Sequence, residues 1–437
     1  NLPEPVSAQG RVYVDVSVRC TVYALKSADG TVLWNYAVGS TIDSSPTVYK
    51  GMLVFGSADG YVHCLDAATG ALAWTFLAAP EQRLISVHGR LESSWPVHGS
   101  VIVKNDELCF TAGSSSYLGG GIYFYRLNPV TGEMLASNVI SHIDPVTEKQ
   151  TVEVEVSFDS VGVSTDILSS DGDFLFLKHI QLDDQGNEHE AATPHLFSPT
   201  SLLEEDWFVR TYWTYAPGIK SQKGYAGWNG WNGTAKENPA GRILSITDDA
   251  VYGYGRIGVA AGGVGHKSNR YHLFASPKVY QPEAPKADPG LTKAEAKKPR
   301  KKSKKPTVTK TFEWSETAPF TVRAMVATAD SLIVAGVPDL GRRPGDIDPM
   351  KSPEKHQASQ NAQKGKDPTK VTLQFENPVE ALAAFRGERG GYLRTVSKED
   401  GSMLREFKLD GVPVPDGMSV ANGKLFISLK NGSVSCY

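Results

Sequence analysis

One unit of about 40 residues repeats along this chain, and this repeat constrains the fold more than any other feature. Residues 10–36 (GRVYVDVSVRCTVYALKSADGTVLWNY) align over their whole length with residues 51–76 (GMLVFGSADGYVHCLDAATGALAWTF). The offset between the two copies is 40 residues, which is the length of one four-stranded propeller blade. The repeat therefore predicts an all-β chain that is built from blades.

Further copies lie along the rest of the chain. Residues 107–136 carry a third copy with Gly132 at the turn, and residues 391–407 carry a fourth with Gly401 at the turn. In each copy a short alternating strand ends at Asp-Gly, Thr-Gly or Asn-Gly, pairs that accept positive φ and close tight hairpins. One such sheet cannot bury both of its faces, whereas a closed ring of sheets can.

We therefore expect a single β-propeller over residues 1–437. Seven four-stranded blades are the preferred count and eight are the alternative, with the seven starting near Pro5, Asp43, Trp95, Ser157, Gly227, Phe320 and Val412. The last blade shows only three strands, around a partial copy of the unit at residues 423–437. Either the ring closes through the N-terminus or a strand is absent.

Two inserts interrupt the repeat. Residues 283–306 are rich in Pro, Ala and Lys, and residues 341–370 are polar with almost no apolar side chains. Neither insert can bury enough apolar surface to offset its ordering entropy, so we expect both to be disordered surface loops. The run from Lys297 to Lys305 carries seven positive charges in nine residues. It predicts either a solvated loop or a contact with an anionic surface.

Composition narrows the classes of partner. The net charge is −3, which gives no reason to expect a specific nucleic-acid partner. No run of 18 apolar residues exists, so no transmembrane helix is expected. The chain begins at Asn1 without a signal peptide, which suggests a processed product or an excerpt from a longer protein. The four cysteines contain no C-x-x-C pair, and we expect all four thiols to be free.

The segment CLDAATGALAW at residues 64–74 resembles the tryptophan-docking repeat of propellers of the pyrroloquinoline-quinone (PQQ) type, roughly A-x-D-x-x-T-G-x-x-x-W. Asp66, Thr69, Gly70 and Trp74 match this pattern. The resemblance covers about half of the chain clearly and the rest by spacing. It implies that the Trp packs over the turn Gly of a neighbouring blade and fixes blade to blade.

The first copy of this motif carries Gly30 and Trp34 at the same positions, so the resemblance assigns structural roles to Gly30, Trp34, Gly70 and Trp74. It is specific for fold but weak for function, because the same repeat occurs in quinone dehydrogenases and in non-catalytic proteins. The latter include a lipoprotein that assists outer-membrane barrel assembly and large exported bacterial proteins. The resemblance implies a periplasmic or otherwise exported location.

The sequence gives little support for an enzymatic function. The adjacent cysteine pair over which PQQ stacks in the dehydrogenases has no counterpart, and neither has their Glu/Asn/Asp set for calcium. GYGRIG at residues 253–258 fits a dinucleotide motif, but the Gly-rich stretch after it cannot form the required helix. We assign no catalytic residue, no metal ligand and no cofactor. A quinone-dependent or polysaccharide-acting enzyme that uses the central funnel is the alternative to a binding or scaffold module.

Clusters of aromatic and charged residues are the candidates for ligand binding, because rings together with Arg and Glu suit a groove for a protein or a polysaccharide. The same residues could instead pack between blades. The candidates are Glu92, Trp95 and His98 in LESSWPVHG, Trp207, Arg210 and Trp213 in DWFVRTYW, Trp228 and Trp231 in GWNGWNG, and Arg256.

Overall fold

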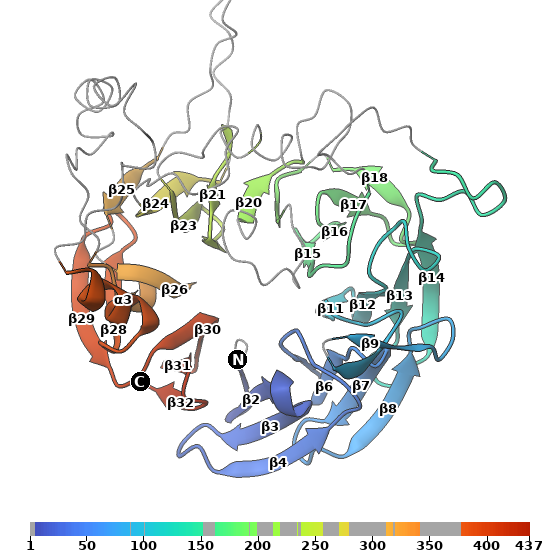
Figure 1. Ribbon diagram of the computed structural model, residues 1–437, viewed down its shortest axis with the longest axis horizontal. Helices are drawn as coiled ribbons and strands as arrows, with labels where there is room; N and C mark the ends of the chain where they lie inside the picture. Colours follow the sequence, from blue (N-terminus) through green and yellow to red (C-terminus); the bar gives the residue numbers. More distant parts are fainter. Residues whose placement is uncertain are drawn as a thin grey trace, which may run out of the picture.

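Antiparallel sheets follow one another around a ring in the computed structural model of this protein (Figure 1). The structure describes residues 5–87, 89–99, 101–151, 162–191, 193–198, 213–218, 234, 237–256, 271–278, 312–317, 320–340 and 377–437. Both inserts predicted from the sequence, residues 283–306 and 341–370, lie outside these residues. Within the described part, eight sheets form blades, which is the larger of the two counts that the sequence allowed.

The first four blades have four strands each. Blade 1 is β1 (Val6–Ala8), β2 (Arg11–Val16), β3 (Thr21–Lys26) and β4 (Val32–Ala37), with the short 3-10 helix η1 (Ser17–Arg19) after β2. Blade 2 is β5 (Thr47–Tyr49), β6 (Met52–Gly56), β7 (Tyr61–Asp66) and β8 (Leu72–Leu77). Blade 3 is β11 (Ile102–Lys104), β12 (Glu107–Ala112), β13 (Ile122–Leu127) and β14 (Met134–Ile140). Blade 4 is β15 (Leu168–Ser170), β16 (Leu175–Leu177), β17 (Ile180–Leu182) and β18 (Glu188–Glu190).

The other four blades complete the ring. Blade 5 is β19 (His195–Phe197), β20 (Trp213–Ala216) and β21 (Ala240–Gly241). Blade 6 is β22 (Ile243–Ile246), β23 (Ala250–Arg256), β24 (Tyr271–Pro277) and β25 (Trp314–Thr317). Blade 7 is β26 (Phe320–Ala327), β27 (Ser331–Pro338), β28 (Gly391–Ser397) and β29 (Met403–Leu409). Blade 8 is β30 (Pro413–Ala421), β31 (Lys424–Leu429) and β32 (Val434–Cys436).

Two elements lie outside the blades. The hairpin β9 (Leu84–Val87) and β10 (Arg90–Ser93) forms a separate two-stranded ribbon between blades 2 and 3. Helix α3 (Pro378–Arg386) precedes β28. The side chain of Asn377 accepts hydrogen bonds from two backbone N–H groups of the first turn, and Gly387 ends the helix in the left-handed conformation. Helix α3 therefore has both of the capping signals that define a short helix.

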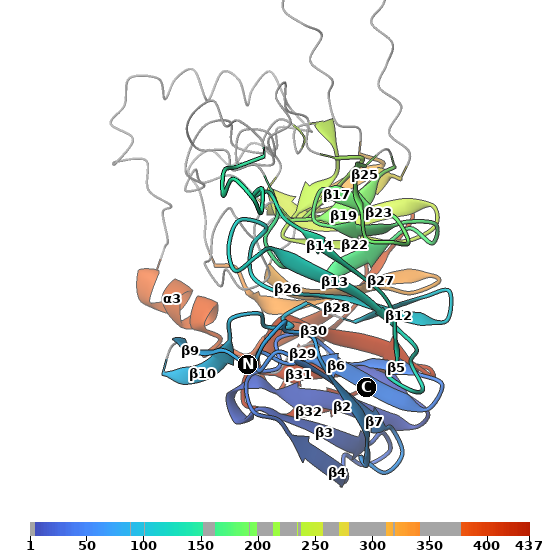
Figure 2. The same cartoon turned by 90° about the vertical axis from the view of Figure 1, so that its right-hand side faces the viewer.

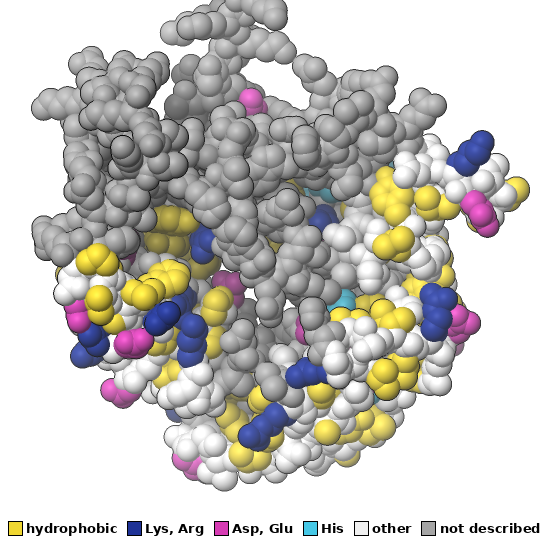
Figure 3. All heavy atoms as spheres, viewed as in Figure 1, with side chains coloured by type: hydrophobic (Ala, Val, Ile, Leu, Met, Phe, Trp, Pro, Cys, Tyr) yellow, Lys and Arg dark blue, Asp and Glu magenta, His cyan; other side chains and the backbone are white. Residues whose placement is uncertain are grey.

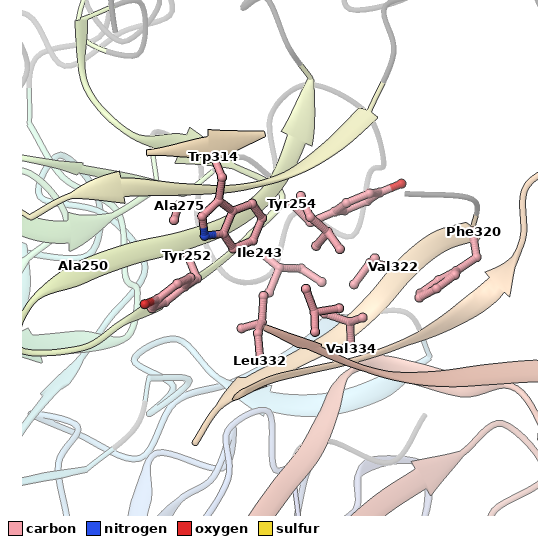
Figure 4. Close-up of a cluster of buried hydrophobic side chains, with 12 residues drawn as sticks. Ile243, Ala250, Tyr252, Tyr254, Ala275, Trp314, Phe320, Val322, Leu332 and Val334 are labelled. Atoms are coloured by element: carbon pink, nitrogen blue, oxygen red, sulfur yellow. The ribbon is translucent and has the colours of Figure 1, made fainter. Parts of the chain in front are cut away.

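Hydrophobic clusters join neighbouring blades. Figure 4 shows the cluster between blades 6 and 7, where Trp314 and Tyr252 face Leu332 and Val334 across the interface. An equivalent cluster joins blades 2 and 3 through Val54, Leu108, Phe110 and other buried side chains. The alternation of each strand supplies one such face on either side of its sheet.

Indole rings also pack across these interfaces, on the hairpin turns between strands 3 and 4 of the next blade. Trp34 of blade 1 packs on Gly70 of blade 2, where an added Cβ would lie 2.6 Å from the ring. Trp74 of blade 2 packs on Gly132 of blade 3 in the same way, at 2.7 Å. Both indoles are partly buried rather than fully enclosed. Each turn thus needs Gly for two reasons, because its φ is positive and because the ring occupies the space of a side chain.

Blade 8 closes the ring against blade 1 with three strands. The strand β1 pairs with β2 inside its own blade, so the described N-terminal residues contribute no strand to blade 8. Contact between the two blades involves Val12 and Val14 of β2 and Phe426 of β31. Closure through the N-terminus, one of the two alternatives from the sequence, is not seen among the residues that the structure describes.

Candidate interaction face

The connections between strands divide the propeller into two faces. Strands 1–2, and strands 3–4 in the four-stranded blades, are joined on one face, which we call the turn face. Strands 2–3 and successive blades are joined on the other, which we call the loop face. The ribbon β9–β10 lies in a connection between blades, and α3 lies in the connection from β27 to β28. Figure 2 shows both elements projecting from the same side of the ring.

Helix α3 exposes an apolar stripe on this loop face. Val379, Leu382 and Phe385 are 74%, 48% and 61% exposed. Their spacing of three residues places them along one side of the helix. The side that packs on the propeller carries only small residues, Ala381, Ala383 and Ala384, all of which are buried. The larger apolar side chains of the helix therefore face outward.

The ribbon exposes apolar side chains as well. Leu84 and Ile85 on β9 and Leu91 on β10 are 55%, 46% and 60% exposed. Leu118, in the neighbouring connection between β12 and β13, is 67% exposed. Figure 3 shows hydrophobic side chains gathered over the α3 region and beside the ribbon on this face. Exposed apolar groups thus occur on both sides of the central opening.

Trp95 anchors the base of the ribbon. Its side chain is 5% exposed, and its Nε1 donates a hydrogen bond of 2.6 Å to the carbonyl of Gly119 in blade 3. The guanidinium of Arg83 lies 4.5 Å from the centre of the ring, and Arg83 Nε also donates to Ser94 Oγ at 3.1 Å. These contacts fix the ribbon against blade 3 and leave little of the indole accessible to a ligand.

An Asp–His pair joins the same connection to the segment between blades 1 and 2. His98 Nδ1 lies 2.6 Å from Asp43 Oδ2, and both side chains are largely buried. Thr41 Oγ1 donates a second hydrogen bond to Asp43 Oδ2 at 3.2 Å. The pair therefore fixes two loop-face connections to one another.

Asp15 at the end of β2 is a buried acid nearby. Burial raises the pKa of its carboxyl to about 8, and the charge of Asp43 adds to this increase. Oδ2 accepts a hydrogen bond of 3.3 Å from Ser17 Oγ, whereas Oδ1 has no partner. Arg90 of the ribbon donates to the carbonyl of Ser17 at 3.3 Å. The raised pKa favours the protonated form of Asp15, whose hydrogen-bond partner Ser17 is also the residue that Arg90 of the ribbon contacts.

The structure separates the candidate residues chosen from the sequence. Glu92, Trp95 and His98 share one connection on the loop face. Trp213 begins β20 on the turn face and is half-buried, while Arg256 ends β23 in blade 6, on the loop face. Trp207, Arg210, Trp228 and Trp231 lie outside the described residues. A ligand-binding role for these residues stays a prediction.

Sequence reasoning missed helix α3. Its signal was present in the sequence as Asn377-Pro378 at the start of PVEALAAFR and Gly387 directly after it.

Among the described residues, no three His, Cys, Asp or Glu side chains gather in an arrangement that could hold a metal ion. None of the helices in the described part is long and apolar enough to span a membrane. The four cysteines are unpaired.

Comparisons with known proteins show which proteins the N-terminal repeats resemble. The family model described as "Outer membrane protein assembly factor BamB" matches residues 2–148. BamB of Yersinia pestis is 37% identical over 130 residues, which is 29% of this chain and 31% of that protein. BamB of Moranella endobia (strain PCIT) is 32% identical over 104 residues, 23% of this chain and 25% of that protein. The chain is a PQQ-like repeat propeller. The matched segment spans less than a third of either curated relative.

A solved structure shares the fold of this chain. Quinohemoprotein alcohol dehydrogenase from Comamonas testosteroni aligns with a TM-score of 0.52 and 12% identity, covering 98% of this chain and 70% of that chain. At this identity the likeness shows the fold alone. BamB from Moraxella catarrhalis aligns with a TM-score of 0.47 and 11% identity, covering 99% and 93% of the two chains.

Proposed function

We propose that this propeller is a non-catalytic, exported scaffold that binds a protein partner through its loop face. The observation that carries the proposal is the exposure of apolar side chains on both α3 and the β9–β10 ribbon, which project from the same face. Exposed apolar patches on a folded domain mark interaction sites, because leaving them in water is unfavourable. The curated relatives are named outer membrane protein assembly factors, which supports a role in assembly of exported proteins.

A protein partner suits this surface better than a polysaccharide. The exposed side chains of α3 are Val379, Leu382 and Phe385, and those of the ribbon are aliphatic. A sugar would require convergent polar groups around a ring, whereas an apolar stripe on a helix suits the hydrophobic centre of a protein interface. Small alanines seat the helix on blade 7 and hold the stripe outward.

Site-specific photo-crosslinking tests the proposal in cells that produce the protein. A photoreactive residue at Phe385 and, separately, at Leu91 should capture the same partner protein. The control position is Val32, which is 53% exposed on the outer strand of blade 1. Capture of one partner from Phe385 and Leu91 but not from Val32 supports the proposal. Equal yields at the three positions would contradict it.

A double substitution tests whether the apolar stripe of α3 itself contributes to partner binding. Leu382→Ser with Phe385→Ser should leave folding intact because both side chains are largely exposed, yet should lower crosslinking at Leu91 by about tenfold or more. Met403→Ser with Leu404→Ser is the matched control, since both residues are 55% exposed on β29. An unchanged yield in the α3 variant would show that the ribbon contacts its partner independently of α3.

A further inference from the structure

Basic side chains from two blades meet at the C-terminal end of helix α3. Arg323 on β26 donates a hydrogen bond of 3.0 Å from Nη2 to the carbonyl of Phe385, in the last turn of the helix. Gly387, which ends the helix, packs on Val412 so closely that a Cβ would find no room. The carbonyl of Val412 accepts a hydrogen bond of 2.8 Å from the backbone N–H of Lys430, in the turn after β31. Arg323 of blade 7 and Lys430 of blade 8 are thus both joined to the end of α3.

No carboxylate in the described part of the chain balances these two charges. Burial lowers the pKa of the Arg323 guanidinium, and partial burial together with the charge of Arg323 lowers the pKa of the Lys430 amine. An acidic neighbour would raise both pKa values, whereas here the two cations act on each other. Nη1 of Arg323 is buried and makes no hydrogen bond, and Lys430 is exposed. An anion that reaches Lys430 from solvent would therefore relieve the repulsion between the two groups.

A third basic residue lies on α3 itself. Arg386 is exposed and follows Leu382 by four residues, so its side chain flanks the apolar stripe. It has no acidic partner among the described residues, in contrast to Arg389, which binds both carboxylate oxygens of Glu380 at 2.8 and 2.7 Å. Figure 3 shows basic side chains beside the hydrophobic ones in the α3 region. Positive charge thus borders the stripe, although the net charge of the chain is −3.

We propose that the protein partner of the loop face is acidic where it meets α3, and that carboxylates beside its apolar contact residues pair with Lys430 and Arg386. This inference rests on the function proposed above and adds the chemistry of the partner. Apolar side chains of the partner cover the stripe of α3, while its carboxylates lie at the rim of the contact. Complementary charge at a rim chiefly steers the encounter and selects the partner, because a basic surface in the same place would be repelled.

An anionic membrane carries the same charge as an acidic protein but fits the shape of this surface less well. Helix α3 projects from the ring, whereas Lys430 belongs to the turn between β31 and β32 and Arg323 to β26, within the blades (Figure 2). A flat bilayer on the projecting stripe would not reach basic groups at its foot, whereas a protein surface can follow this relief. Helix α3 also has nine residues, fewer than the roughly 20–30 of many interfacial membrane helices.

Carbodiimide coupling tests the ion pair directly, because this reagent joins an amine to a carboxylate that contacts it. The photoreactive residue at Phe385 identifies the partner protein in cells that produce the chain. In extracts of the same cells, the carbodiimide should join Lys430 to an Asp or Glu of that same partner, and peptide mass spectrometry locates the bond. Lys430→Arg keeps the charge and removes the amine. It should abolish the coupling and leave the photo-crosslinking yield at Phe385 unchanged.

Charge reversal measures how much the basic groups contribute. Arg386→Glu with Lys430→Glu should lower photo-crosslinking at Phe385 by about tenfold or more, because like charges then face each other. Arg405→Glu with Lys408→Glu is the matched control, since it makes the same change of charge at exposed residues of β29 and should leave the yield unchanged. Raising the salt concentration from about 0.1 M to about 1 M should lower the yield of the unchanged protein by roughly threefold or more, because the added ions screen rim charges.

The outcomes separate this inference from the proposed function. Capture of one partner from both Phe385 and Leu91 that neither charge reversal nor salt changes would overturn the acidic contact and leave the protein-binding function standing. Lack of a common partner at the two positions would overturn both. Sedimentation with vesicles of about one quarter phosphatidylglycerol and three quarters phosphatidylethanolamine tests the membrane. Vesicle binding that the Arg386→Glu, Lys430→Glu variant loses would overturn the inference in favour of an anionic membrane.

Discussion

Removal of one docked indole should measure how strongly neighbouring blades hold one another. In Trp74→Ala the side chain lost is partly buried between blades 2 and 3 and donates to the carbonyl of Pro129. A Trp covers about 200 Å², so burying about half of it contributes roughly 2.5 kcal/mol at about 25 cal/mol per Å². The hydrogen bond adds about 1 kcal/mol. We expect a loss of about 3.5 kcal/mol, in the lower part of the roughly 3–5 kcal/mol typical of buried Trp truncations.

Urea unfolding followed by circular dichroism measures this loss. Trp74→Phe separates the two contributions, since it keeps most of the ring contact and removes the N–H donor, and it should cost about 1 kcal/mol. A loss below about 1 kcal/mol for Trp74→Ala would show that the indole does not fix the two blades together. A change in the slope of unfolding with urea would instead indicate that the blades no longer unfold as one unit.

A double-mutant cycle with Gly132 tests the contact itself. Gly132→Ala places a methyl group 2.7 Å from Trp74 and also strains a backbone with φ of +71°. In the Trp74→Ala background only the backbone strain remains, so the two changes should couple by about 1 kcal/mol or more. Gly51→Ala, with a similar φ and open space, reports the backbone cost alone. Additive effects would refute the packing of this indole on the Gly132 turn.

Three further outcomes follow from buried groups and from the sequence. Alkylation without reductant should modify Cys20 and Cys436 in the native protein and should modify Cys64 and Cys109 only after unfolding, because burial raises the pKa of the latter two thiols to about 12. The free energy of unfolding should fall as pH rises from about 4 to about 8, because native Asp15 keeps a proton that the unfolded chain releases. The slope from this one group is at most about 1.4 kcal/mol per pH unit. Asp15→Asn should remove the contribution of Asp15 to this slope in urea melts. Addition of PQQ with calcium should leave the melting temperature unchanged, and a clear rise would favour the enzyme alternative.

The repeat predicted those blades in which Gly and Trp recur at a fixed spacing. Blades 1 and 2 follow directly from the 40-residue offset. Blade 4 was harder to delimit, because its four strands have three residues each and strands this short show little alternation. The sequence grouped its strands with those of the next blade, so seven blades were preferred although eight are present.

Contacts that come from a different strand could not be predicted from spacing. The third copy of the unit has Ala136 where the docking Trp would stand. In the structure Phe124 of β13 fills the space over Gly186 instead. The ring thus comes from strand 3 rather than strand 4, and only the packing of two sheets reveals the replacement. The exposure of α3 was equally hidden, since its apolar residues resemble a core helix in sequence.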